Sequence, residues 1–202
     1  MRIGMIGAGR VAQAVARHAL AAGHEVVLSN RHGPASLAGL VRDLGPQASA
    51  GTPAEAAKAD LVLLAVPWDA IQAAPEATGV ADWAGRIVID ATNHFAAPPP
   101  PVKIVDLGDL TASEYVASLL PGARVVKAFN NLTVPYIAAD PSHPEGRQIV
   151  LLAGDDPDAK RQVADLAGSF GFAPVDLGSL REGGRLIQLG GPLIPFHALK
   201  QD

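Results

Sequence analysis

A glycine-rich segment near the start of the chain has the composition of a phosphate-binding turn. The sequence Gly7-Ala8-Gly9-Arg10-Val11-Ala12 matches G-x-G-x-x-A and directly follows the apolar run Arg2–Ile6. In such a turn the first glycine allows the tight bend, the second lets the backbone approach a pyrophosphate, and the small last residue lets a helix pack against the strand. The free N–H groups of that helix then face the phosphates. Gly7, Ala8, Gly9, Arg10 and Val11 are therefore predicted to bind a dinucleotide; the alternative is a glycine-rich turn without a ligand.

The end of the second predicted strand indicates which dinucleotide is bound. Folds that prefer NAD place an Asp or Glu there, and its carboxylate accepts hydrogen bonds from the adenosine ribose. This chain has Ser29-Asn30-Arg31 at that place. A carboxylate would repel a 2′-phosphate, whereas a hydroxyl, an amide and a guanidinium can all donate hydrogen bonds to it, the guanidinium as a fork. The segment predicts NADP(H) rather than NAD(H) as the cofactor.

Two further strand ends are candidates for binding the nicotinamide half of the cofactor. Ala65-Val66-Pro67 ends the run Asp60–Val66, and Thr92-Asn93 follows the run Arg86–Ala91. Ligands of open α/β sheets lie beyond the carboxyl ends of the strands, so these residues are predicted to flank the ribose and the nicotinamide. The Asn93 amide suits a ribose hydroxyl or a carboxamide, whereas Pro67 has the simpler interpretation of a proline that starts a helix.

The sequence lacks the residues of several other chemistries. A short-chain dehydrogenase pairs a catalytic Tyr with a Lys one helical turn later, but at that spacing Leu119 follows Tyr115 and Asp140 follows Tyr136. The chain has no cysteine and therefore no thiolate nucleophile, and its six histidines show no metal-ligand spacing with carboxylates. Hydride transfer between two stacked rings needs proximity and orientation rather than an obligatory acid or base. Accordingly, no catalytic residue and no metal ligand is predicted.

Two titratable side chains near the predicted site each have two interpretations. Lys127 lies in an apolar strand, where it is either a buried acid or substrate anchor, or a lysine whose ammonium reaches the sheet edge or binds a carboxylate. We favour the second interpretation. His94 follows Asn93 and either donates a proton to a flavin or carbonyl oxygen or is a loop histidine without a role.

The rest of the chain alternates short β-rich runs with helical patterns, which is typical of a doubly wound α/β fold. We predict a Rossmann-like, mostly parallel sheet of six to eight strands flanked by helices. Residues 1–202 are taken as a single NADP-binding domain with a short C-terminal extension at the acceptor site. The predicted strands are Arg2–Ile6, Glu25–Asn30, Asp60–Val66, Arg86–Ala91, Arg124–Phe129, Gln148–Ala153 and Pro174–Leu177, and the predicted helices run over about Gly9–Ala22, Pro34–Leu44, Pro157–Phe170 and Leu180–Leu189.

Composition limits the partners and the compartment. The net charge is −4 and the basic residues are scattered, which argues against a nucleic-acid partner. No apolar run approaches the ~20 residues of a membrane span, and the absence of cysteine fits a reducing cytoplasm, so we predict a cytoplasmic protein without a membrane partner. The apolar stretch Leu186–Leu199 is predicted to cover the acceptor pocket, to form the seam of a homodimer, or to do both. The predicted partner is thus a small-molecule redox acceptor.

Over nearly its whole length the chain resembles the F420-dependent NADP oxidoreductases and their relatives, including the reductase domain of the STEAP metalloreductases. The resemblance rests on Gly7-Ala8-Gly9, Ser29-Asn30-Arg31, Val66-Pro67-Trp68, residues 125–131 (VVKAFNN), Ala153-Gly154-Asp155-Asp156, residues 176–180 (DLGSL) and Gly191-Pro192-Leu193. It implies a flavin or deazaflavin that stacks over the nicotinamide, with Ala128 beside the cofactor. It also implies an acceptor pocket bordered by Phe129, Asn130, Asn131, Pro192 and Leu193.

The function that follows from these features is hydride transfer between NADP(H) and a flavin or deazaflavin acceptor, such as F420, FMN or riboflavin. Two alternatives remain open. One is a non-catalytic NADP(H)-binding sensor or regulatory module, because Rossmann folds also host such roles. The other is a reductase of small imines or ketones, although such enzymes build the substrate site with a C-terminal helical domain for which the sequence shows no pattern.

Overall fold

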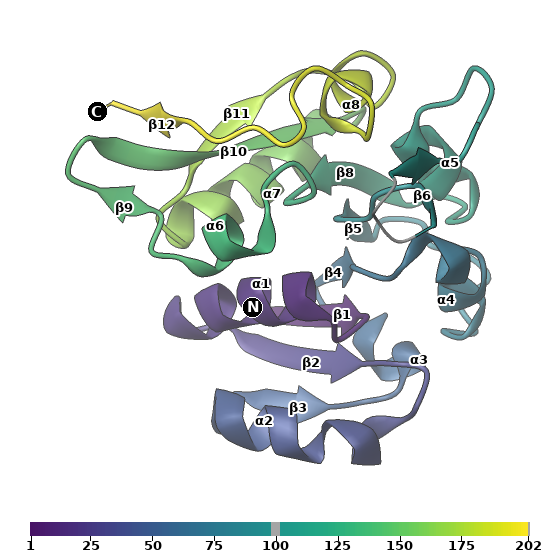
Figure 1. Cartoon of the computed structure of the whole chain (residues 1–202). Coiled ribbons are helices and arrows are strands. Elements are labelled where there is room, and N and C mark those ends of the chain that lie inside the picture. The colour runs from purple at the N-terminus through teal and green to yellow at the C-terminus, as the bar shows by residue number, and fades with distance from the viewer. Residues whose placement is uncertain (98–101, 202) are drawn as a thin grey trace.

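A computed structural model describes residues 1–97 and 102–201, and its centre is one large twisted sheet (Figure 1). Eight strands form the continuous path of this sheet, in the spatial order β11-β10-β8-β5-β4-β1-β2-β3. Their bounds are β1 (Arg2–Ile6), β2 (Glu25–Ser29), β3 (Ala48–Ala50), β4 (Leu61–Leu64), β5 (Ile87–Asp90), β8 (Arg124–Ala128), β10 (Gly146–Gly154) and β11 (Ala173–Asp176).

The strand order places a topological switch between β1 and β4. From β1 the chain proceeds outward through β2 to β3, and it then returns to β4 on the other side of β1. All neighbours along this path are parallel except β8 and β10, which pair antiparallel. In open α/β sheets the ligand lies beyond the carboxyl ends of the strands at such a switch point, so the fold itself directs a ligand to the end of β1.

Helices cover both faces of the sheet, and alternation along the strands produces two apolar cores. Ile3 and Met5 pack in one core with helix α1, whereas Ile6 of the same strand packs in the other. Residues of α1 (Arg10–Ala21), α2 (Ala38–Leu44), α6 (Val134–Ala138) and α7 (Pro157–Ser169) belong to the first core. The second core takes residues of α3 (Pro53–Ala56), α4 (Ala73–Glu76) and α5 (Ala112–Ser118).

The C-terminal part of the chain packs on β10 and reaches the end of β8. Helix α8 (Glu182–Ile187) contacts β10 and α5, and Leu193 and Phe196 of the following segment pack with Leu151 and Ile187 in a third apolar cluster. In Figure 1, α8 and the yellow C-terminal segment lie at the top, far from β2 and β3 at the bottom. The apolar C-terminal stretch therefore covers β10, and the predicted homodimer stays a prediction.

The predicted doubly wound, mostly parallel fold is confirmed, and the differences concern short elements. The expected helix over Pro34–Leu44 is a 3₁₀ helix, η1 (Pro34–Leu37), followed by α2. Strands β9 (Ser142–His143) and β12 (Leu199–Lys200) pair with β10 and bring the sheet to ten strands among the described residues. The sequence signal misses them because two residues show no alternation.

Three more short elements follow the ends of β4 and β5 in the chain. Strands β6 (Phe95–Ala97) and β7 (Lys103–Ile104) form a separate antiparallel pair, and the 3₁₀ helix η2 (Trp68–Ala70) follows β4. Residues 98–101 are four consecutive prolines, which lack backbone donors and are therefore predicted to form an extended, rigid connector; they lie outside the described residues. Within the described ranges, none of the helices has both the length and the apolar composition needed to cross a bilayer.

Candidate active site

The glycine turn after β1 has the geometry of a pyrophosphate cradle. Gly7 has a φ of +107°, and a Cβ placed on it would lie 2.1 Å from the carbonyl oxygen of Ala65. Only glycine fits at this position. A Cβ on Gly9, by contrast, would meet no atom within 4 Å, so the space above this residue is open. The turn thus leaves room where the backbone of Gly9 must approach a phosphate.

Helix α1 begins directly after this turn with free backbone N–H groups. Gly9 is its N-cap and supplies no side-chain hydrogen bond, and the first turn contains no acidic residue. Arg10 is exposed at the first helical position, Val11 is half-buried, and Ala12 is fully buried against the sheet. Unsatisfied N–H groups and the positive end of a twelve-residue helix dipole favour an anion here. The residues present therefore fit a dinucleotide pyrophosphate.

Ser29 differs from the sequence-based expectation. Its side chain is fully buried, and its hydroxyl donates to the carbonyl oxygen of Met5 over 2.8 Å. The backbone carbonyl of Ser29 accepts from the N–H of Gly7 at 3.0 Å. Ser29 therefore joins β2 to β1 and the glycine turn, and its hydroxyl proton is not directed at a 2′-phosphate. The side chain points inward because residues of a strand alternate between the two faces.

The turn after Ser29 presents a guanidinium at its exposed tip. The Asn30 Oδ1 accepts from the backbone N–H of His32 at 2.9 Å, and its Nδ2 donates to Ser36 Oγ at 3.0 Å. These bonds fix the turn. Arg31 and His32 are exposed, with the Arg31 Nε donating to His32 Nε2 over 3.3 Å. Of the three predicted 2′-phosphate ligands, Arg31 is the one whose charged group is displayed, and Asn30 acts mainly on the shape of the turn.

At the end of β4, Ala65 and Val66 approach the glycine turn, and Pro67 is exposed. The N–H of Ala65 donates to Ile6 across the switch point at 2.9 Å. Trp68 is buried and packs edge-on against the His94 ring, with ring centroids 5.8 Å apart. The end of β4 is thereby packed against the residues that follow β5.

A buried ion pair lies at the paired ends of β5 and β8. Asp90 and Lys127 are register partners, both side chains are 0% exposed, and the Lys127 Nζ is 3.1 Å from Asp90 Oδ2. Nζ also donates to the carbonyl oxygen of Thr92 at 3.1 Å. Asp90 accepts further bonds from Ser113 Oγ and from the N–H and hydroxyl of Thr92. Lys127 binds a carboxylate, so the favoured interpretation of this residue is confirmed. The network also fixes the backbone at Thr92.

A pair of asparagine amides links this strand end to α8. The Asn93 Nδ2 donates to the backbone carbonyl of Asn130 at 3.1 Å, and the Asn130 Nδ2 lies 3.2 Å from Asn93 Oδ1. The same Nδ2 of Asn130 donates to the carbonyl oxygen of Ile187 at 2.6 Å. These bonds hold the ends of β5, β8 and α8 together, so Asn93 and Asn130 are structural ties as well as candidate ligands.

The residues around the end of β8 are arranged differently from the expectation for an acceptor pocket. Ala128 is buried in the first core. Phe129 has a φ of +62°, and its ring packs against Phe170 and Phe172 in that core instead of lining a pocket. A non-glycine residue in this region is strained, and such strain concentrates at functional sites. Asn131 is fully buried, and neither atom of its amide has a partner within the described residues.

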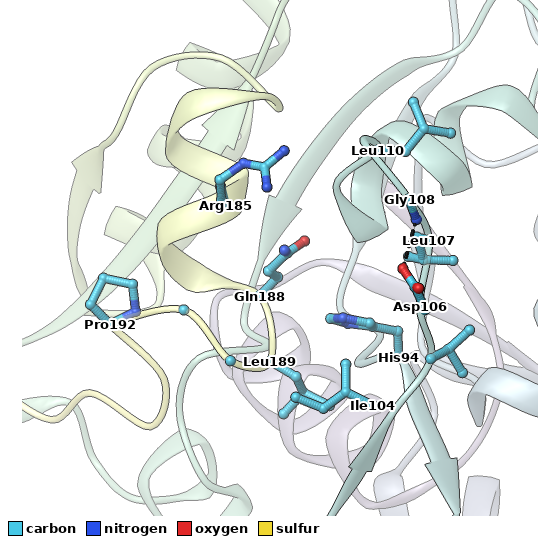
Figure 2. Close-up of a pocket in the computed structure, with 13 residues that line it drawn as sticks. His94, Ile104, Asp106, Leu107, Gly108, Leu110, Arg185, Gln188, Leu189 and Pro192 are labelled. Atoms are coloured by element: carbon cyan, nitrogen blue, oxygen red, sulfur yellow. Dashed lines mark hydrogen bonds between the residues drawn. The ribbon is translucent and has the colours of Figure 1, made fainter.

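A pocket of about 480 Å³ opens beside the end of β5, between β7 with its following loop and α8 with its following loop. Figure 2 shows His94, Ile104 and Asp106 on one side and Arg185 and Gln188 on the other, with the His94 ring directed into the space between them. Pro192 lines this pocket, whereas Leu193 turns toward the third apolar cluster, and the role of both at an acceptor site stays a prediction. The remaining lining residues are Val105, Leu107, Gly108, Leu110, Leu189, Gly190 and Gly191.

His94 is a neutral polar group in this pocket. Burial lowers the pKa of its imidazole below the usual value of 6.5, and the nearby Lys127 ammonium lowers it further, against the opposing effect of Asp90. The ring therefore carries no charge at neutral pH and offers one donor and one acceptor. Its Nδ1 is buried and has no hydrogen-bond partner in the described part of the chain.

Sequence reasoning missed one wall of the pocket. The loop 104–110 has no motif, and no sequence pattern marks Gln188, whose Oε1 accepts from the N–H of Ala112 and so connects α8 to the start of α5. Arg185 lies in the last turn of α8, with its Nη2 donating to the carbonyl oxygen of Asp109 at 3.0 Å. The sequence signal that could have indicated this wall is the basic residue in the last turn of the short helix α8.

Comparison with known proteins agrees with this arrangement. The model of the family "NADP oxidoreductase coenzyme F420-dependent" matches residues 2–94, the part that carries the glycine turn and the ends of β2, β4 and β5. A crystal structure of hypothetical protein SMa0349 from Sinorhizobium meliloti is 42% identical, with a TM-score of 0.92, and the match covers 100% of this chain and 97% of that chain. A structure from Arthrobacter sp. FB24, assigned as an F420-dependent NADP reductase, is 25% identical with a TM-score of 0.81 over 99% of this chain and 100% of that chain.

The chain belongs to the F420-dependent NADP oxidoreductase family. It is thus a member of a family of NADP-dependent oxidoreductases. Among curated proteins it is 32% identical to Metalloreductase STEAP3 of Rattus norvegicus over 180 residues, which are 89% of this chain and 34% of that protein. The chain spans about one third of that relative, so the similarity concerns one part of the larger protein.

The two glycines of the family turn make a matched pair of tests. Gly7→Ala should destabilise the fold by at least about 2 kcal/mol, because the methyl group would collide with the Ala65 carbonyl at a positive φ. Gly9→Ala should change stability by less than about 0.5 kcal/mol, because its Cβ meets nothing and its φ is −74°. It should nevertheless weaken NADP⁺ binding at least about tenfold. Urea unfolding and calorimetric titration measure the two effects, and unchanged NADP⁺ affinity in Gly9→Ala would contradict the placement of the pyrophosphate.

The buried pair can be tested by removing one charge. Lys127→Met should cost about 3–5 kcal/mol in urea unfolding, because it leaves the Asp90 carboxylate buried without its cation. The double variant with Asp90→Asn should recover part of this loss. Arg161→Met is the control, because Arg161 pairs with Asp158 on the surface, where the side chains are 65% and 62% exposed, and its loss should cost less than about 1 kcal/mol. Equal costs for the two single variants would refute the proposed structural role of the buried pair.

Proposed function

We propose that this protein transfers hydride between NADP(H) and a flavin or deazaflavin that binds in the pocket lined by His94 and Arg185. The observation that carries the proposal is the position of that pocket: it opens at the residue directly after Asn93, beyond the carboxyl end of β5. A nicotinamide that reaches this strand end from the switch point would face the pocket. In this proposal residues 1–202 act as one NADP-binding unit whose C-terminal segment completes the acceptor site.

The cofactor would lie across the strand ends in an extended form. Its pyrophosphate would bind the N–H groups at the start of α1 above Gly9, and its 2′-phosphate would bind Arg31 at the tip of the turn after β2. The ribose and nicotinamide would pass Ala65 to Pro67 and reach Thr92 and Asn93. The absence of any Asp or Glu from residues 29 to 42 supports NADP(H) over NAD(H).

The chain's own residues bind and orient the two rings. When bound, NADPH would supply a hydride with its bonding electron pair, and the acceptor ring would take up this hydride together with a proton from solvent. Such a step depends on proximity and orientation. The bonds from Lys127 to Thr92 and from Asn130 to Asn93 and Ile187 fix the walls on which both rings would rest. Trp68 beneath His94 keeps the ring of that residue in place.

Cofactor preference provides one test. Arg31→Leu should lower kcat/KM for NADPH by about 10-fold to 100-fold and leave kcat/KM for NADH nearly unchanged, because a charge-assisted bond to the 2′-phosphate contributes about 1.5–3 kcal/mol. Arg42→Leu removes an equally exposed charge from α2 and should change neither value. If Arg31→Leu affects both cofactors equally, this guanidinium does not bind the 2′-phosphate.

Acceptor turnover is the direct test of the activity. The purified chain is mixed with NADPH and, in separate reactions, with riboflavin, FMN or F420, and the loss of NADPH absorbance is followed. We expect oxidation that depends on both enzyme and acceptor. Tight binding of NADPH without oxidation by any of the three would contradict the proposal and favour a non-catalytic sensor, whereas oxidation by a cyclic imine alone would favour an imine reductase.

A further inference from the structure

The charged groups of the acceptor pocket are nearly balanced. Among the described lining residues the titratable side chains are His94, Asp106 and Arg185, and His94 is neutral at neutral pH. Asp106 is exposed, and its Oδ1 accepts from the N–H of Gly108 at 2.9 Å. The single carboxylate therefore offsets the single guanidinium, and the pocket has no surplus of positive charge.

The residues next to the lining in the sequence do not add a surplus either. Lys103 contributes one exposed cation next to Ile104, and Asp109 contributes one exposed carboxylate next to Gly108. These two charges also cancel, so they give an anionic substituent no net attraction.

The walls of the pocket suit an uncharged, flat ring. Ile104, Leu107, Leu189 and Pro192 supply apolar surface for the faces of such a ring. The larger part of the exposed lining is polar and includes the Gln188 amide and the neutral His94 ring, which supply hydrogen-bonding groups without charge. The volume of about 480 Å³ lies within the usual range for small-molecule sites.

The residues predicted to bind the cofactor phosphates have the opposite character. Arg10 is exposed at the start of α1 and Arg31 at the tip of the next turn, where the pyrophosphate and the 2′-phosphate of NADP(H) would lie. Guanidinium groups are well matched to phosphate. The chain thus provides guanidinium groups where the cofactor phosphates would lie. On the acceptor side, by contrast, Asp106 offsets the one guanidinium, that of Arg185, and this difference is informative about the acceptor.

We propose that the acceptor is a flavin-type ring without a phosphate or carboxylate tail, of the riboflavin kind, and that Asp106 selects against phosphorylated acceptors. The inference rests on the proposed function. It disfavours FMN, which has a phosphate on the ribityl chain, and F420, which has both a phosphate and carboxylates. A tail that leaves the pocket past Asp106 and Asp109 would bring its anion close to their carboxylates.

The test compares kcat/KM for riboflavin, FMN and F420 with NADPH at low ionic strength. The wild-type protein should prefer riboflavin over FMN by roughly threefold to tenfold, and the preference should shrink in high salt because mobile ions screen exposed charges. Asp106→Asn keeps the oxygen that accepts from Gly108 and should raise the ratio of FMN to riboflavin several-fold. Asp43→Asn, which removes an exposed charge from α2 at the far side of the sheet, should leave this ratio unchanged.

The outcomes separate the two proposals. If the wild type uses FMN or F420 as well as riboflavin or better, the inference on acceptor charge is overturned while the hydride transfer stands. The inference also fails if Asp106→Asn and Asp43→Asn give the same ratio of FMN to riboflavin. If no flavin or deazaflavin oxidises NADPH, the proposed function itself fails.

Discussion

Inside the sheet, the ammonium of Lys127 contacts both the carboxylate of Asp90 and the carbonyl of Thr92, and water reaches neither charged side chain. Charges removed from water are tolerated only when they are paired and their remaining donors and acceptors are hydrogen-bonded. For the Asp90 carboxylate, Ser113 and Thr92 donate these further hydrogen bonds. This requirement fixes the backbone between β5 and the residues that follow it. The placement of both the nicotinamide end and the acceptor pocket depends on that backbone.

The carboxyl ends of the strands carry two regions of different chemistry, which form the two halves of the proposed site. At the switch point between β1 and β4, a glycine turn, a helix start and exposed guanidinium groups provide what phosphates require. Beyond β5 the lining mixes polar and apolar groups, its only charges among the described residues are one carboxylate and one guanidinium, and the histidine is neutral. A charged cofactor on one side and an uncharged ring on the other would satisfy both halves, and their meeting point is the end of β5.

Local patterns predict the first half well and the second half poorly. The glycine turn and α1 are encoded in consecutive residues whose roles follow from backbone geometry, so Gly7 and Gly9 lie where their spacing predicts. Ser29 and Phe129 are at the expected strand ends, but a side chain there can face the core or the cleft, and the hydrogen bond to Met5 and the ring packing with Phe172 decide this. The pocket wall formed by Asp106 and Arg185 joins segments distant in sequence, and tertiary contacts alone bring them together.

A crystal structure of the protein with both NADP⁺ and riboflavin tests the central claim most directly. The account predicts the 2′-phosphate at Arg31, the nicotinamide beside Asn93, and the flavin in the pocket beside His94. The reacting carbon of the nicotinamide should then lie roughly 3–3.5 Å from the flavin atom that receives the hydride. A flavin bound outside this pocket, or a nicotinamide directed away from the end of β5, would contradict the account.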